Sequence, residues 1–384
     1  MKNTLIQGQV AARPKPKESQ AHTGIQPLSP LTHRTQRFQP LPAPLGEPPY
    51  HYDIEAAIPG IIQKAQTAKK IVFHTVGDTG GIKTPDYQAM VAAAMKRDLL
   101  NPDGNTPSFF YHLGDVVYYN GEINKYYDQF YEPYNHYDAP IFAIPGNHDG
   151  DPIDNTQTSL DGWVAYFMTA TPHVDPVSKD EPRVTMSLPN VYYTLICPFV
   201  TIVGMYTNVP EHGSIDSVQQ QWLTNELNTA AKDKALIVSL HHPIYSFDDH
   251  HSGSPSMADA VQHAINDSRR VPNMVLSAHV HNIQRIEKKI MPDVPTPFLV
   301  AGNGGYYHLH NLTAGAGDID DKTGAELMYG DDKSHGYVTL TVDAEKISGV
   351  VNLVDKTTGN VAQTDTFSYT AKAQFLADGV VITL

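Results

Sequence analysis

Residues 70–81 of this 384-residue chain read KIVFHTVGDTGG. An apolar, β-prone run leads directly into an acidic side chain, Asp78, which Gly77, Gly80 and Gly81 surround. Three interpretations compete for such a stretch: an ordinary turn, a loop that cradles phosphate, or a metal ligand held at the end of a strand. A Gly-Asp pair after a strand is most often a turn. This stretch alone therefore does not decide between them.

The same arrangement recurs along the chain, because five apolar runs end in side chains that can bind metal. These are Asp78 in VGDTGG, Asp115 in LGDVVYY, Asn147 and His148 in PGNHD, His241 and His242 in SLHHP, and His279 with His281 in SAHVH. In open α/β sheets, sites form outside the carboxyl ends of the strands. We therefore expect these side chains to converge.

Helical stretches separate the apolar runs, which predicts a mainly parallel α/β sheet. The clearest are YQAMVAAAMKRDLL, SVQQQWLTNELNTAAKD and SMADAVQHAINDS. Residues 335–369 alternate between apolar and polar side chains, as antiparallel strands do, and are expected to close a second sheet. The pattern favours one large domain with two sheets and helices outside them.

Proline dominates the start of the chain, with nine prolines in residues 1–49. Segments such as RPKPK and PLPAPLGEPP leave little room for regular structure. We therefore predict an N-terminal arm over residues 1–69 and a catalytic domain over residues 70–384.

Charge and cysteine content narrow the function. The net charge is −14, although residues 1–40 hold six Lys or Arg residues and one acid. Such a body repels polyanions, so no tracking along nucleic acid is expected and small substrates are favoured. Cys197 is the only cysteine, which excludes an intrachain disulfide.

The expected location is cytoplasmic, because the first residues lack the apolar core of a secretory signal. A periplasmic or secreted location stays open if a signal was removed. No apolar run approaches the roughly 18 residues that span a membrane, so no membrane association is expected. The oligomeric state is not indicated.

The ordered series GDTGG, GDVVY, GNHD, VSLH and AHVH resembles the calcineurin-like metallophosphoesterase superfamily. Within it, the series is similar to the purple acid phosphatase branch, whose pattern is GDxG, GDxxY, GNH(D/E), VxxH and GHxH. The resemblance covers residues 70 to about 369. It implies an α/β (α+β) four-layer sandwich, in which helices flank two mixed β-sheets and the metal site lies at the strand C-terminal ends. Ala278 departs from the family's Gly, which raises a question of backbone strain but removes no ligand.

The resemblance also implies two metal ions. Most of the superfamily has Asp-x-His where this chain has Asp78-Thr79-Gly80, and Tyr118 would replace that histidine, with Tyr119 as an alternative. A phenolate beside two carboxylates favours Fe(III), whereas imidazoles and an amide suit Zn, Fe(II) or Mn(II). The first metal would take Asp78, Asp115, Tyr118 and His281, and the second would take the bridging Asp115 with Asn147, His241 and His279.

In the family pattern, a hydroxide held by the two metals is the nucleophile. His148 would protonate the leaving group, with Asp149 orienting it. His250 and His251 match a pair that plant enzymes place over the substrate, although loop histidines are often solvated surface. His242 is expected to make outer hydrogen bonds and Asn303 to line the pocket, while His308 and His310 are expected to be structural.

Three functions are compatible with this sequence. The first is a phosphomonoesterase acting on a small phosphoester. The same two-metal core also serves a phosphodiesterase or nucleotide hydrolase. The third is a non-catalytic protein that binds phosphate or metal, although a decayed site would be expected to have lost some of these ligands.

Overall fold

The computed structural model describes residues 37–100 and 104–384. The strands are β1 (His51–Asp53), β2 (Ile71–Val76), β3 (Phe109–His112), β4 (Ile141–Ala143), β5 (Tyr193–Ile196), β6 (Val200–Gly204), β7 (Ala235–Ser239), β8 (Arg270–Val271), β9 (Met274–Ser277), β10 (Ile283–Met291), β11 (Val294–Ala301), β12 (Glu326–Asp331), β13 (Gly336–Val342), β14 (Lys346–Val354), β15 (Val361–Thr370) and β16 (Gln374–Phe375). The α-helices are α1 (Ile61–Ala68), α2 (Pro85–Leu99), α3 (Asn147–Gly150), α4 (Asp161–Phe167), α5 (Ser217–Thr229) and α6 (Pro255–Ser268). Shorter helical turns are η1 (Ile54–Ala56), η2 (Ile123–Lys125), η3 (Tyr127–Tyr131, a π-helix) and η4 (Pro176–Ser178).

One sheet has the strand order β15-β14-β13-β2-β3-β4. Strands β2, β3 and β4 run parallel and end together, since Val76 pairs with His112 and His112 pairs with Ala143. The C-terminal strand β13 pairs antiparallel with β2, so β13–β15 extend the sheet that β2 begins. This corrects the expectation that residues 335–369 close a second sheet. Their alternation predicted strands but could not predict the pairing partner.

The other large sheet has the order β1-β5-β6-β7-β9-β11-β10-β12. Its centre, β6-β7-β9-β11, is parallel, and β10 pairs antiparallel with both β11 and β12. Strands β6, β7 and β9 are buried along their whole length, as strands covered on both faces are. Their carboxyl ends therefore also lie at one edge.

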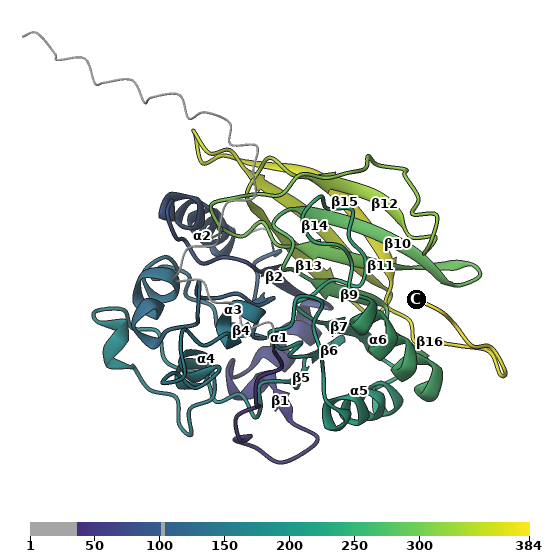
Figure 1. Cartoon of the computed structure of the whole chain (residues 1–384), viewed down its shortest axis with the longest axis horizontal. Helices are drawn as coiled ribbons and strands as arrows, with labels where there is room; N and C mark the ends of the chain where they lie inside the picture. Colours follow the sequence, from purple (N-terminus) through teal and green to yellow (C-terminus); the bar gives the residue numbers. More distant parts are fainter. Residues whose placement is uncertain (1–36, 101–103) are drawn as a thin grey trace, which may run out of the picture.

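The two sheets pack face to face, with hydrogen bonds crossing between them. Tyr111 Oη on β3 lies 2.8 Å from Ser239 Oγ on β7, and Tyr193 Oη on β5 donates to the carbonyl oxygen of Ala143 on β4 at 3.2 Å. Helices cover the outer faces, with α2 beside β13 and β14 and with α5 against α6 (Figure 1). The expected four-layer α/β architecture is confirmed. None of the helices in the described ranges combines the length and apolar character that crossing a membrane requires.

The folded body begins earlier than residue 70. Strand β1 pairs parallel with β5, and α1 buries Ile61 and Ala65. Residues 51–68 thus belong to the sandwich, which corrects the predicted boundary of the arm, because proline content marks irregular chain but not where packing starts. Residues 37–50 contain no helix or strand, and the rest of the predicted arm, residues 1–36, lies outside the described residues.

Candidate metal centre

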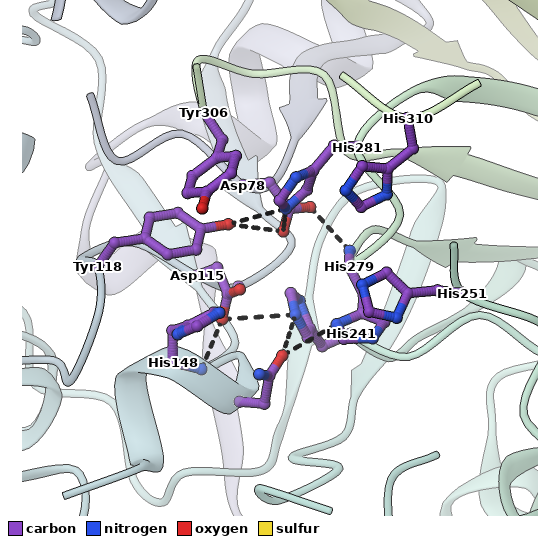
Figure 2. A network of polar contacts seen from close by, with 12 residues as sticks. Asp78, Asp115, Tyr118, His148, His241, His251, His279, His281, Tyr306 and His310 are labelled. Carbon is purple, nitrogen blue, oxygen red and sulfur yellow. Dashed lines mark hydrogen bonds and ion pairs between the residues drawn. The ribbon is translucent and has the colours of Figure 1, made fainter. Parts of the chain in front are cut away.

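The loops that follow β2, β3, β4, β7 and β9 bring their polar residues into one pocket (Figure 2). All seven predicted metal ligands lie there and are buried, namely Asp78, Asp115, Tyr118, Asn147, His241, His279 and His281. One ligand atom from each of Asp78, Asp115 and His241 lies within 4.8 Å of the other two. The predicted convergence of strand ends is therefore what the structure shows.

The backbone turns sharply at three of these residues. Asp78 and Asp115 have φ of 54° and His279 has φ of 65°, in the left-handed region that side chains rarely adopt. Such conformations persist only where the surroundings fix them, and they cluster at functional sites. Gly146 leaves room for Asp115, because a Cβ on Gly146 would lie 2.1 Å from Asp115 Oδ1. The pocket thus depends on glycine and on strained turns together.

Ala278, the residue that departs from the family pattern, fits without such strain. It is not among the residues with positive φ, and its Cβ lies against Gly77, where a second Cβ would come within 2.6 Å. The methyl group that replaces hydrogen at residue 278 therefore occupies the space that Gly77 leaves. Ala278 therefore introduces no backbone strain of the left-handed kind.

One side of the pocket brings together a phenol, a carboxylate and an imidazole. Tyr118 Oη donates to Asp78 Oδ1 at 3.0 Å and lies 3.3 Å from His281 Nε2. His281 Nε2 lies 3.4 Å from Asp78 Oδ1, and the Nδ1 of its ring donates to the carbonyl oxygen of His308 at 3.1 Å. The hydrogen bond from Nδ1 fixes the His281 ring so that Nε2 faces the Asp78 carboxylate. Imidazoles that bind a metal are oriented in the same way.

The other side combines an amide with two imidazoles around Asp115. His241 Nε2 lies 3.1 Å from Asn147 Oδ1 and 3.4 Å from Asp115 Oδ1. His279 Nδ1 lies 2.9 Å from Asn147 Oδ1, and His241 Nδ1 donates to the carbonyl oxygen of Leu113 at 2.9 Å. Asp115 faces both sides of the pocket, as a bridging ligand must (Figure 2).

The electrostatics of the pocket fit cations. Among the described residues, the ion pairs of Asp78 and Asp115 are with histidines only, and no Lys or Arg compensates them. Burial raises the pKa of Asp78 well above its ordinary value. Burial acts in the same direction on Asp115, but His241 and His148 outweigh it and lower the pKa of that carboxyl. Two adjacent buried carboxylates are unfavourable unless positive charge joins them, so this donor set fits metal ions.

The phenol and the imidazole beside it lead to the same conclusion. Burial, with the charges of Asp115 and Asp78, raises the pKa of Tyr118 well above its ordinary value. Burial lowers the pKa of His281, which leaves its Nε2 lone pair available. A phenol in this position ionises only beside a strongly polarising cation. Tyr118 is thus placed as a metal ligand would be.

His148 lies at the pocket, but Asp149 does not orient it. His148 Nδ1 donates to the carbonyl oxygen of Tyr119 at 2.8 Å, and the His148 backbone N–H donates to Asp115 Oδ1 at 2.9 Å. The Asp149 carboxylate instead accepts backbone N–H groups of residues 116, 117 and 146, at 2.8–3.2 Å. Asp149 therefore ties two loops together. The predicted orienting role is corrected, because backbone donors reach this carboxylate first.

Of the remaining predicted residues, two are loop histidines near His279, and two make hydrogen bonds that support the surrounding structure. His251 is buried with its ring 4.5 Å from that of His279, and His250 is the exposed neighbour of His251. His242 Nδ1 lies 2.7 Å from Thr207 Oγ1, as an outer hydrogen-bonding role predicts. Asn303 Nδ2 donates to the carbonyl oxygen of Ser334 at 3.0 Å, so its side chain holds a loop.

Three side chains at the pocket were not predicted for it. The ring of His310, expected to be structural, lies 4.5 Å from the ring of His281. Tyr306 packs 4.4 Å from the ring of Tyr118 and 4.3 Å from that of His281 (Figure 2). Glu211 Oε1 lies 2.5 Å from His251 Nδ1. The only available signal was the density of aromatic and histidine residues in GNGGYYHLH; nothing marked Glu211.

Comparison with solved structures agrees with this architecture. Purple acid phosphatase PPD1 from yellow lupin (Lupinus luteus) seeds has a TM-score of 0.55 at 17% identity, covering 78% of this chain and 53% of that one. GAP50, the anchor in the inner membrane complex of Plasmodium, has a TM-score of 0.54 at 16% identity, covering 79% of this chain and 89% of that one. This chain thus spans about half the length of the lupin protein. At such identities the likeness establishes the fold.

Comparison with family profiles identifies the family of this chain. No curated protein matches the chain. The profile described as calcineurin-like phosphoesterase matches residues 69–282, more than half of the chain, and this range includes all seven candidate ligands. The chain therefore belongs to the calcineurin-like phosphoesterase family, and its strand ends gather the candidate ligands of the dinuclear metal site that this family implies.

Proposed function

We propose that this protein hydrolyses small phosphate monoesters at a dinuclear metal centre of the purple acid phosphatase type. The observation that supports it most is the place of Tyr118, whose hydroxyl oxygen lies 3.0 Å from Asp78 Oδ1 and 3.3 Å from His281 Nε2. A tyrosine pointing away from these two groups would have removed the reason to propose this type.

The two halves of the pocket differ in the cation they suit. Asp78, Asp115 and Tyr118 offer hard oxygen donors that would favour Fe(III), whereas Asn147, His241 and His279 suit Zn, Fe(II) or Mn(II). When bound, two such cations would lower the pKa of a water molecule and neutralise charge on the phosphoryl group.

The chain itself supplies the proton for the leaving group. Because His148 Nδ1 donates to a backbone carbonyl, the proton that moves must be carried on Nε2. The His148 ring lies 4.6 Å from that of Tyr118, on the side of the pocket where Asp115 lies. His148 is therefore the general acid in this proposal.

The choice of a monoester rests on the side chains next to the candidate ligands His279 and His281. Imidazole rings gather there rather than apolar side chains, and the cluster includes His251 and His310 beside the ligand His281. Imidazoles in place of apolar side chains leave no apolar surface for the second ester group of a diester, which favours a monoester. The fold does not by itself imply catalysis, since GAP50 is described as an anchor.

Parallel assays test the proposal. Protein loaded with iron and with zinc or manganese is offered p-nitrophenyl phosphate and bis(p-nitrophenyl) phosphate, and turnover of both is measured. Faster turnover of the monoester is expected. Faster turnover of the diester would support a phosphodiesterase, and two bound metals without turnover of either ester would support a binding protein.

A further inference from the structure

A second histidine cluster lies beside the candidate metal centre. His250 and His251 lie on the loop between β7 and α6, and His310 lies on the loop after β11. The ring centroids are 4.6 Å apart for His250 and His251, 4.8 Å for His250 and His310, and 5.2 Å for His251 and His310. One ring nitrogen of each lies within 4.8 Å of the other two. Two loops that are distant in sequence thus bring three imidazoles together.

Two of these rings are held by carboxylates. His251 Nδ1 lies 2.5 Å from Glu211 Oε1, and His310 Nδ1 lies 3.2 Å from Asp248 Oδ2. A carboxylate can only accept, so each ring donates from Nδ1, and in the neutral ring the lone pair lies on Nε2. This carboxylate–histidine pairing is the arrangement that orients an imidazole toward a metal and raises its basicity.

Asp248 also fixes the two loops against each other. Its side chain has no exposed surface, and its Oδ2 accepts the backbone N–H groups of His250 at 3.3 Å and His251 at 2.9 Å. Its backbone pairs with that of Leu312, two residues beyond His310. The cluster is therefore built by a buried side chain and is not a chance meeting of surface residues.

We propose that His250, His251 and His310 bind a third divalent cation next to the dinuclear centre. Three imidazoles with one open position form a common zinc site, and imidazole also suits copper and nickel. Glu211 and Asp248 would offset the charge of the cation. An anion is less suited to this cluster, because two of the rings already donate their N–H groups to carboxylates and offer lone pairs.

The third site would lie close to both halves of the centre. The ring of His251 is 4.5 Å from that of His279, and the ring of His310 is 4.5 Å from that of His281. A zinc ion holds its nitrogen ligands at about 2.0–2.1 Å. His250, which is exposed, has room to adjust to that distance.

The number of bound zinc ions tests the proposal. Metal-free protein is dialysed against buffered zinc in the micromolar range, and zinc per chain is measured for the wild type, His250→Ala and His308→Ala. Three ions are expected for the wild type and two for His250→Ala, which removes an exposed ring and leaves the core intact. His308→Ala is the matched control and should retain three, because that exposed ring lies outside the cluster.

A wild type that saturates at two ions would overturn the proposal, as would a His250→Ala variant that retains the wild-type zinc content. In the second case, weaker binding of inorganic phosphate to the variant would assign the cluster to phosphate instead. The dinuclear centre is tested separately with Asn147→Ala. If that centre binds no metal, the wild type should hold one ion that His250→Ala loses, so failure of one site is distinguishable from failure of the other.

Discussion

The pocket contains two groups of histidines that are held in different ways. His241 and His281 follow strands, and their Nδ1 atoms donate to the backbone carbonyls of Leu113 and His308. His251 and His310 lie on loops, and side-chain carboxylates hold their Nδ1 atoms. The first group is fixed mainly by the main chain, whereas the second group depends on Glu211 and Asp248.

This difference indicates which residues the reaction depends on most. Groups placed by a rigid scaffold hold their geometry best, and small displacements at a reaction centre are costly. Changes at strand-end residues should therefore abolish chemistry, and changes further out should have graded effects.

The largest effect is expected for Asn147→Ala. Asn147 Oδ1 lies within 3.1 Å of a ring nitrogen of both His241 and His279, so its loss removes an oxygen donor from one half of the centre. One metal should be lost, with about 4 kcal/mol of transition-state stabilisation, or about a thousandfold in kcat. Metal analysis and turnover of p-nitrophenyl phosphate measure both. Asn225→Ala, on the exposed face of α5, is the control, and unchanged turnover in Asn147→Ala would refute the ligand assignment.

A smaller loss is expected for His148→Ala, about 100-fold on a substrate whose leaving group needs a proton. An alkyl phosphate requires that proton, whereas p-nitrophenolate leaves without it. The ratio of kcat values for the two substrates should therefore change, with the alkyl ester losing more. Equal losses on both would contradict the role of general acid.

Tyr118→Phe should remove the colour of the iron-loaded protein. In protein loaded with Fe(III), the proposed phenolate ligand gives a pink to violet charge-transfer band, and the substitution should remove it. Tyr119→Phe is the matched control, because Tyr119 is the alternative candidate for this ligand. If Tyr118 is the ligand, Tyr119→Phe should leave the band in place. Visible absorption spectra decide between them, and bleaching by Tyr119→Phe alone would reverse the assignment.

Much of this arrangement was predictable from the sequence because regular structure repeats a local pattern. The apolar runs at β2, β3, β4, β7 and β9 are each followed within a few residues by a polar ligand type, and parallel strands end at one edge. The position of these polar residues at the strand ends could therefore be predicted without knowledge of long-range contacts. The glycines around the acid in VGDTGG make room for close neighbours, because a Cβ on Gly77 would lie 2.6 Å from that of Ala278 and a Cβ on Gly80 would lie 2.7 Å from Tyr118 Cδ2.

What could not be predicted depends on contacts between distant loops. Glu211 meets His251 across 40 residues, and His310 meets Asp248 across 62 residues. Loops lack the periodicity that predicts helices and strands. The pairing of β13 with β2 is of the same kind, because alternation predicts a strand but not its neighbour. The sequence therefore predicted that the candidate ligands converge, but not the contacts of Glu211 and Asp248 that hold His251 and His310.

The smallest expected effect concerns a buried histidine without a role in the site. His74 on β2 has no exposed surface, and its ring nitrogens lie 3.1 Å from Tyr137 Oη and from Asp98 Oδ2. Burial lowers the pKa of His74, although Asp98 acts in the opposite direction. The unfolded chain should thus take up a proton below about pH 6.5 that the folded chain resists.

The neutral His74 ring therefore contributes to the free energy of unfolding above about pH 6.5. This contribution is lost as the pH falls toward the folded-state pKa of His74, by at most about 1.4 kcal/mol per pH unit. Urea unfolding of His74→Gln and the wild type at about pH 7.5 and about pH 5.5 should show a smaller decline in the variant. A chelator removes metal linkage from the measurement, since metal binding would itself depend on pH. His136→Gln, an exposed histidine, should behave as the wild type. Equal declines in all three proteins would mean that His74 is not held neutral by burial.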